Sequence, residues 1–503
     1  MLDYLRKRPM IIAAVGCILS AVCGFYFKSA LFLCLLMSIF VGIWCLNRKN
    51  PTAVTVMILI IIMNISTIYE LWQINSLEVF GNTTKTAEIC FEKSTYSRNN
   101  YCISEFEVVD GDIPRGTRLS LSHTPFYCET GEIIEAKISL EKVSENYRVS
   151  EFSDGIYLSG KIEAFNRTEY KDEVLGTVEN LRNYIRKWLF SNMSYDSAAT
   201  VSALVFGDKS YFSDEFDKNV RASGVAHVMV VSGMHLSVIV TLILRITERF
   251  VYNAKLKAGI MLLSVLLLSA VCGFTKSILR AGITYVVMAL GILLKRSYTP
   301  ENALGTAVTF ILISSPFVIF NVSFQLSVLS TFGILAVALP ICEASKGKLK
   351  GILKETFQMA VLSLSAMLMT LPVVIYVFGY VSTVGVITNL LISVPASFCL
   401  SLAVIALILS PLLPFTASCL LAICDIAVRY INDVINFMGS FEFSTVAVGK
   451  WGAVVSVILI ILCLHLMLAC KVQKSMLKLE RMNRKIISER GRKSKWQSFT
   501  KNN

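Results

Sequence analysis

Charged residues are scarce in this 503-residue sequence. Asp, Glu, Lys and Arg make up 17% of it and hydrophobic residues 54%, whereas an ordinary soluble domain is roughly 25% charged. A bilayer core about 30 Å thick is crossed by about 20 apolar residues of helix, because a helix satisfies its own backbone hydrogen bonds. The shortage of charge argues against an ordinary soluble protein, and the long apolar runs predict a mainly α, polytopic membrane helical bundle.

Histidine and nucleotide-binding glycine loops are also lacking. The four histidines, His123, His227, His235 and His465, are too scattered for the clustered His and Asp ligands of a two-metal hydrolase. His227 and His235 are eight residues apart, not the four that place two zinc ligands on one helical face. No Walker-type loop is present. We therefore expect no bound metal or cofactor, and no enzymatic activity of this chain.

Three apolar runs predict an N-terminal membrane anchor over residues 1–68. Arg6-Lys7-Arg8 ahead of the first run resembles the start of a signal peptide. Two further runs follow at once and no small-x-small cleavage site is evident, so we expect the first helix to be retained. The runs are Pro9 to Phe27, Ala30 to Leu46 and Thr52 to Ile68.

Residues 69–190 form a polar interlude in which turn signals such as Asp110-Gly111-Asp112 separate short alternating segments. Five short strands suit a small OB-like β-barrel, which we assign to residues 69–165. An amphipathic helix within residues 166–195, suited to a membrane surface, is predicted to link this domain to the rest of the chain. The expected strands are Thr86 to Glu92, Tyr101 to Val109, Thr117 to His123, Ile133 to Leu140 and Ile156 to Ile162.

Cysteine is plentiful, but most of the 14 residues lie in apolar runs, where a free thiol acts as a small hydrophobe. Cys90, Cys102 and Cys128 lie in the polar interlude. Two of them could pair if that domain faces an oxidising exterior. The sequence leaves open which two, and whether they pair at all.

Apolar character returns over residues 196–470, which we interpret as the main membrane domain, giving about 10–12 spans in total. The run holding Asp425, Arg429 and Asp433 is amphipathic and could lie flat on the membrane. The run around Pro395 could be a broken helix or a re-entrant hairpin. The candidate spans lie near 226–246, 257–274, 278–294, 302–320, 322–341, 356–378, 382–410, 414–438 and 451–470.

Lysine and arginine near the span ends predict a single orientation. Both termini are expected in the cytoplasm and the OB-like domain outside the cell. The tail, residues 471–503, then lies inside and holds 11 Lys+Arg against 2 Glu, so +9. The basic positions that agree are Arg6 to Arg8, Arg48-Lys49, Arg245 to Lys257, Lys295-Arg296 and Lys346 to Lys354.

Four blocks of residues between about 200 and 400 together resemble the ComEC-type competence proteins, a family of DNA-uptake channels. Their order along the chain carries the resemblance more than any single block. The blocks are Ala203 to Asp208 with Arg221 to His227 and Val230 to Leu236; Arg280-Ala281-Gly282-Ile283; Ser315-Pro316 through Phe324 to Ser327 and Gly333-Ile334; and Leu371-Pro372 through Asn389-Leu390-Leu391 to Pro395.

The resemblance implies a channel that moves single-stranded DNA across the cytoplasmic membrane, beside a DNA receptor, a separate nuclease and a cytoplasmic ATPase motor. The resemblance does not decide whether the protein forms a homo-oligomer. Many members carry a C-terminal metallo-β-lactamase-like domain, which we do not find in this sequence, so we expect a short form without nuclease activity. The Asn-Pro-Gly turn common near the end of the family's OB-like module is absent around Ser150 to Gly155.

Polar residues at the start of one span are candidates for a substrate path, because polar groups inside a membrane need a partner or water. His227, Ser232 and His235 could line or gate an aqueous path, with Gly233 permitting close helix approach. They could equally form hydrogen bonds that only hold the bundle together. A third interpretation makes Ser232 a nucleophile and His235 its base, but no orienting carboxylate is visible.

Three further polar residues fall in the resembling blocks. Arg280 could bind phosphate, because guanidinium matches phosphate oxygens, or reach a lipid headgroup. Gln325 and Asn389 could touch substrate or satisfy backbone groups of a broken helix, and the structural role is favoured. Residues 69–190 hold 14 Lys+Arg and 20 Asp+Glu, so 14 − 20 = −6, the wrong sign for a DNA platform. A carrier or exporter of another polar or anionic substrate remains the alternative function.

Overall fold

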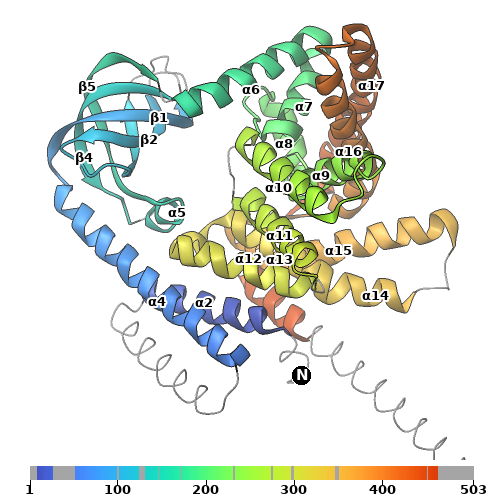
Figure 1. The fold of residues 1–503 in the computed structure, drawn as a ribbon, viewed down its shortest axis with the longest axis horizontal. Coiled ribbons are helices and arrows are strands. Elements are labelled where there is room, and N and C mark those ends of the chain that lie inside the picture. Colours follow the sequence, from blue (N-terminus) through green and yellow to red (C-terminus); the bar gives the residue numbers. More distant parts are fainter. Residues whose placement is uncertain are drawn as a thin grey trace, which may run out of the picture.

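The structure is a computed structural model in which a β-barrel is joined to a helical bundle (Figure 1). Expectations that fall on Ala30 to Leu46, Cys128, Ser232 or the tail 471–503 lie outside the described residues. Those described are 8–26, 51–98, 101–123, 131–145, 147–171, 173–229, 233–272, 276–295, 299–345, 350–449 and 451–462.

The polar interlude folds into the closed five-stranded barrel that the sequence predicts. Its strand order is β1-β2-β3-β5-β4, with β3 and β5 parallel and the other pairs antiparallel. Along β4, Ile134, Ala136, Ile138 and Leu140 are buried while their neighbours are more exposed, which is the alternation of a barrel wall. The strands are β1 (Thr84–Arg98), β2 (Tyr101–Gly111), β3 (Arg118–His123), β4 (Glu132–Lys142) and β5 (Ile156–Lys171).

The strand register limits the cysteine pairing. Cys90 lies opposite Glu107, whereas Cys102 lies opposite Ser97. Cys102 is therefore five residues from the position opposite Cys90, or roughly 17 Å along the strand. A disulfide needs Cα atoms within about 7 Å, so Cys90 and Cys102 cannot pair with each other in this fold.

The bundle contains seven described helices long and apolar enough to cross a membrane, and three shorter apolar helices. Together with the barrel they confirm a polytopic membrane protein. The N-terminal helices are α2 (Pro9–Tyr26), α4 (Pro51–Leu77), η1 (Glu78–Phe80), α5 (Arg148–Ser153) and α6 (Glu173–Asn192). The main domain holds α7 (Tyr195–Phe206), α8 (Asp214–Ala222), α9 (Gly233–Thr247), α10 (Ala254–Val271), α11 (Lys276–Leu293), α12 (Pro300–Ser314), η2 (Pro316–Phe320), α13 (Val322–Gly333), η3 (Ile334–Ala338, a π-helix), α14 (Leu339–Ala344), α15 (Gly351–Phe378), α16 (Gly385–Leu409), α17 (Pro414–Gly439), η4 (Glu442–Ser444) and a helix over Trp451–Leu462.

The structure describes two runs that the sequence left open. α16 continues through Pro395 as one helix, so the run is neither broken nor re-entrant. α17 lies against α16, α7 and α8, and its polar side chains bind protein groups. Asp425 accepts a hydrogen bond from Ser194 at 2.8 Å, and Thr200 donates to Asn432 at 2.9 Å. Part of the polar face of α17 therefore packs against α7 and the residue before it.

The barrel shares its core with membrane helices. Ile74 and Leu77, at the end of α4, are buried in the barrel core. Phe317 of η2, the turn between α12 and α13, is fully buried in the same core. Phe25 at the end of α2 packs edge-on against Phe317, with ring centroids 5.2 Å apart. Because its core is completed by these residues, the barrel is fixed to the bundle and is not a loosely tethered module.

A buried polar pair strengthens this attachment. Tyr157 of β5 donates its hydroxyl hydrogen to the carboxylate of Glu70 on α4, and both side chains are less than a tenth exposed. Burial raises the pKa of Tyr157, and the charge of Glu70 and their hydrogen bond raise it further. The phenol therefore stays protonated at physiological pH and remains a donor.

We predict that Tyr157→Phe destabilises the protein by about 1.5–3 kcal/mol, because it removes a donor from a buried carboxylate. The matched control is Tyr147→Phe, which removes a hydroxyl from a side chain that is 66% exposed and should change stability by less than about 0.5 kcal/mol. Thermal unfolding of the purified protein in detergent measures both. Equal midpoints for the two variants would contradict a stabilising role of the pair.

Candidate functional site

The connection between α8 and α9 is built around Gly224. Its φ of +75° lies in the left-handed region, which glycine adopts at little cost. A Cβ here would lie 2.7 Å from the Ser382 side chain and 3.0 Å from the Cα of Gly385. Ser382 in turn donates a hydrogen bond to the carbonyl of Ala222 at 2.8 Å. The Arg221-to-His227 block thus needs glycine because its backbone closes on the start of α16.

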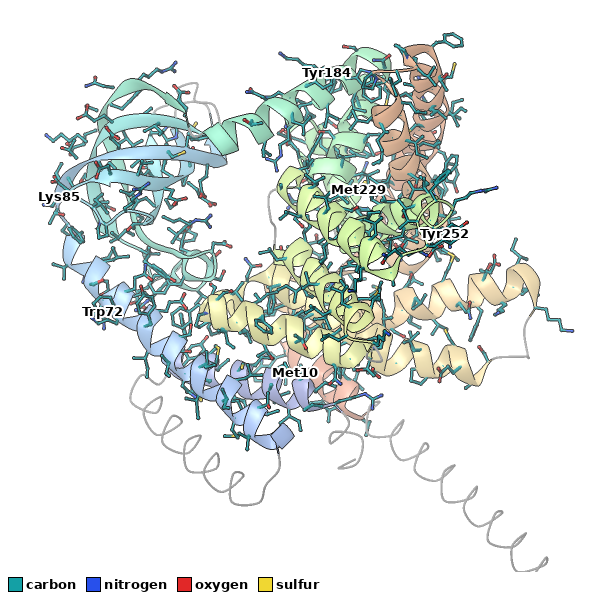
Figure 2. The ribbon with its side chains drawn as sticks, viewed as in Figure 1. Met10, Trp72, Lys85, Tyr184, Met229 and Tyr252 are labelled. Atoms are coloured by element: carbon teal, nitrogen blue, oxygen red, sulfur yellow. The ribbon has the colours of Figure 1, made fainter. Side chains whose placement is uncertain are left out.

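Connections far apart in the sequence meet beside this turn. β6 (Tyr380–Ser382) pairs with β7 (Thr445–Ala447) in a two-stranded antiparallel sheet. Asn219 of α8 donates to the side chain of Asn436 near the end of α17, at 3.1 Å. We call this assembly the clasp: β6, β7 and the α8–α9 connection. Met229, the last residue that the structure describes before α9, is fully buried in the bundle core and is labelled in Figure 2.

Beyond the clasp, residues from the first two turns of α9, α11 and α13 meet around Arg280. A Cβ on Gly233, the first residue of α9, would lie 2.8 Å from Nη2 of Arg280, so glycine leaves room for the guanidinium. Arg280 lies in the second turn of α11 and is 9% exposed. Its Nε donates to Oγ of Ser327 in the second turn of α13, at 2.8 Å. We call this meeting point the arginine junction: Gly233, Arg280 and Ser327.

The arginine junction is electropositive for two reasons. Arg280 keeps its charge at any physiological pH. Gly233 also lies in the first turn of α9, where the unpaired N–H groups of a helix N-terminus carry roughly half an elementary positive charge. Potentials of one sign add, so the guanidinium beside the start of α9 favours an anion, and guanidinium suits phosphate in particular.

The two candidate histidines lie next to this junction in different environments. His235, in the first turn of α9, is 1% exposed. His227, in the α8–α9 connection, is exposed to solvent and close enough to interact electrostatically with His235. Although the residue is exposed, neighbouring protein restricts hydration of the imidazole and lowers the pKa of His227, and a hydrogen bond to the backbone of Gly224 opposes that shift.

Gln325 and Asn389 have protein partners away from Arg280. Gln325 donates its amide hydrogen to the carbonyl of Ile319 at 2.8 Å and so ties α13 to the η2 turn. Asn389 donates to Ser363 of α15 and accepts from Ser393 on its own helix. Gln325 thus satisfies a backbone carbonyl in the η2 turn that separates α12 from α13. Asn389 lies in the continuous helix α16.

The hydrolase interpretation gains no support from this region. Ser232 lies outside the described residues, so its relation to His235 is not defined. Across the part of the chain that the structure describes, no group of three or more His, Cys, Asp or Glu side chains is arranged to hold a metal ion.

Three residues that we did not propose as site residues from the sequence make contacts within or next to the quoted sequence blocks. Ser327 belongs to the Phe-Gln-Leu-Ser block, and Ser382 follows the long run of α15. Arg186 of α6 pairs with Asp208 at 3.2 Å, so the Ala203-to-Asp208 block anchors the linker helix. Asp208 was part of a quoted block, and its partner lies 22 residues earlier, in the helix that the sequence predicts to be amphipathic.

We predict that Gly224→Ala destabilises the bundle by about 2–4 kcal/mol, from left-handed strain plus a clash with Ser382 and Gly385. Gly379→Ala is the matched control. Gly379 has a φ of +74°, follows α15 directly and has nothing within 4 Å of its Cβ position, so its cost should be about 1–2 kcal/mol. Thermal unfolding in detergent compares the two variants. Equal losses of stability would show that the close approach of Gly224 to Ser382 and Gly385 adds nothing to the cost.

The comparisons with known proteins match the part of the chain that contains this site. The Competence protein family matches residues 204–473, a little over half of the chain and including the clasp and the arginine junction. ComE operon protein 3 of Bacillus subtilis (strain 168) is 26% identical over 274 residues, which cover 54% of this chain and 34% of that protein. The chain thus matches about a third of this relative's length. No solved structure matches the chain. The protein belongs to the competence protein family.

Proposed function

We propose that this protein is a membrane channel for uptake of single-stranded DNA across the cytoplasmic membrane in natural transformation. The arginine junction is the observation that carries the proposal. It places a largely buried guanidinium beside the N-terminus of α9, inside the region that matches the competence family. A DNA strand presents a phosphate at every nucleotide, and successive phosphates suit such an electropositive point. The channel has no chemistry of its own.

The basic residues support one orientation. Arg245 lies in the last turn of α9, Lys255 and Lys257 in the first turn of α10, and Lys295 just beyond α11. These are the ends of α9 and α11 opposite to the arginine junction. Since cytoplasmic connections are enriched in Lys and Arg, we place these ends and both termini inside the cell. The clasp, the arginine junction and the barrel then face outside.

The barrel is not the DNA platform in this proposal. Glu88 of β1 is directly opposite Asp110 on one side and Glu135 on the other, and all three side chains are exposed. A row of carboxylates repels phosphate. We therefore propose that a separate receptor delivers the strand and a separate nuclease prepares it. A cytoplasmic ATPase supplies the force, because this sequence shows no Walker-type loop.

A carrier or exporter of another anion would also use an electropositive junction, and substrate dependence separates the two functions. The test uses a host that lacks this protein, complemented with wild type, Arg280→Gln or His235→Ala at equal membrane levels. Arg115→Gln, on the exposed barrel surface, is the control with the same charge change.

We predict that Arg280→Gln lowers uptake of labelled DNA and transformation by about tenfold or more, because a buried charge-assisted contact is worth roughly 1.5–3 kcal/mol. Arg115→Gln should match wild type. His235→Ala decides whether the buried imidazole acts in transport or only in packing. Unchanged DNA uptake in the host lacking the protein would refute the DNA proposal, and a defect shared by inorganic phosphate or nucleotides would favour the carrier.

A further inference from the structure

Asn321 joins the barrel to the first turn of α13. Its Nδ2 donates to Oδ1 of Asp154 at 2.9 Å, and Asp154 ends the short helix α5 that lies between β4 and β5 of the barrel. Asn321 is also the N-cap of α13, because its Oδ1 accepts from the backbone N–H of Phe324 at 3.0 Å. The side-chain amide of Asn321 therefore binds a barrel residue through its nitrogen and caps a membrane helix through its oxygen.

The surrounding contacts hold this point firmly. Phe320, next to Asn321, packs against Phe25 of α2 with ring centroids 4.6 Å apart. Phe317, four residues before Asn321, is buried in the barrel core. Gln325 ties the first turn of α13 back to the carbonyl of Ile319 at 2.8 Å. The η2 turn and the start of α13 thus belong to the barrel attachment as much as to the bundle.

The same stretch of α13 reaches the arginine junction. Ser327 lies six residues, fewer than two helical turns, beyond Asn321. Its hydroxyl accepts the Nε–H of Arg280, and the guanidinium fills the space that Gly233 leaves on α9. A shift or rotation of the start of α13 must therefore move the acceptor that orients Arg280.

We propose that Asn321 is a positioning residue through which the barrel sets the geometry of Arg280. Asp154 holds Asn321, Asn321 fixes the start of α13, and Ser327 on α13 orients the guanidinium. The barrel, too acidic to hold DNA itself, acts here as a brace for the point that attracts phosphate. The role in transport rests on the proposed DNA function, whereas the physical coupling from Asp154 to Arg280 does not.

A purely structural role of Asn321 makes different predictions, and a set of variants separates them. Asn321→Asp keeps an oxygen acceptor for the Phe324 N–H but places two carboxylates against each other. The exchange of both residues, Asp154→Asn with Asn321→Asp, restores a donor and an acceptor in reversed order. Asn253→Asp is the matched control, because Asn253 caps α10 in the same way, accepting from Lys255 at 2.8 Å, without any barrel contact.

The first experiment is hydrogen exchange on the purified full chain, which reports the coupling without DNA. We predict that Asn321→Asp raises amide exchange at the starts of α13 and α11 together, and that the double exchange returns both to wild-type rates. Asn253→Asp should leave exchange at the starts of α10, α11 and α13 unchanged, because aspartate caps a helix as well as asparagine does. Faster exchange at α13 with α11 unchanged would overturn the proposal, and so would failure of the double exchange to restore protection.

The second experiment is DNA uptake at matched membrane levels. We predict that Asn321→Asp lowers uptake by about tenfold and that the double exchange restores it to within about threefold of wild type. In an Arg280→Gln background, Asn321→Asp should cause no further loss, because residues that act through one another are not additive. If the double variant instead loses uptake by the product of the two single fold losses, the two residues act independently and the positioning role is overturned. Full uptake with Arg280→Gln would refute the function proposed for the junction, and the exchange experiment would still decide the coupling.

Discussion

The structure depends on accommodating the charge of Arg280 inside an apolar bundle. A guanidinium cannot lose its charge, and its removal from water is costly unless protein groups replace the lost hydration. Ser327 supplies a hydrogen-bond acceptor, and Gly233 leaves the space. The start of α9 beside it adds to the positive charge. We interpret this buried cation as functional because a guanidinium suits phosphate.

Close backbone approach then explains why the neighbouring sequence blocks contain glycine. Gly207 ends α7 in the left-handed conformation and lets Asp208 turn toward Arg186. Gly224 lets the α8–α9 connection lie against Ser382 and Gly385. Gly233 serves the arginine junction. In each case the glycine matters for the partner it admits, and the partner comes from a distant segment. The clasp and the junction are therefore parts of one packed assembly.

The barrel and the bundle are joined more tightly than two domains connected by linkers. The barrel core is completed by Ile74 and Leu77 of α4 and by Phe317 of η2. Tyr157 of the barrel donates a hydrogen bond to a carboxylate on α4. A displacement of the barrel would therefore also displace residues of α2, α4 and the start of α13. This rigidity gives the barrel a mechanical use that its acidic surface does not suggest.

The sequence by itself determined the membrane class, the five strands and most helices, because these follow from apolar length and from alternation along the chain. It also located Gly233, His235 and Arg280, which stand out as polar or small residues within apolar runs. Only the tertiary structure decided that Arg280 meets Gly233 and Ser327, that Gln325 and Asn389 bind elsewhere, and that α17 packs against α7. Periodicity shows which face of a helix is apolar but not which neighbour covers it. Contacts between residues tens or hundreds of positions apart arise only when the helices pack.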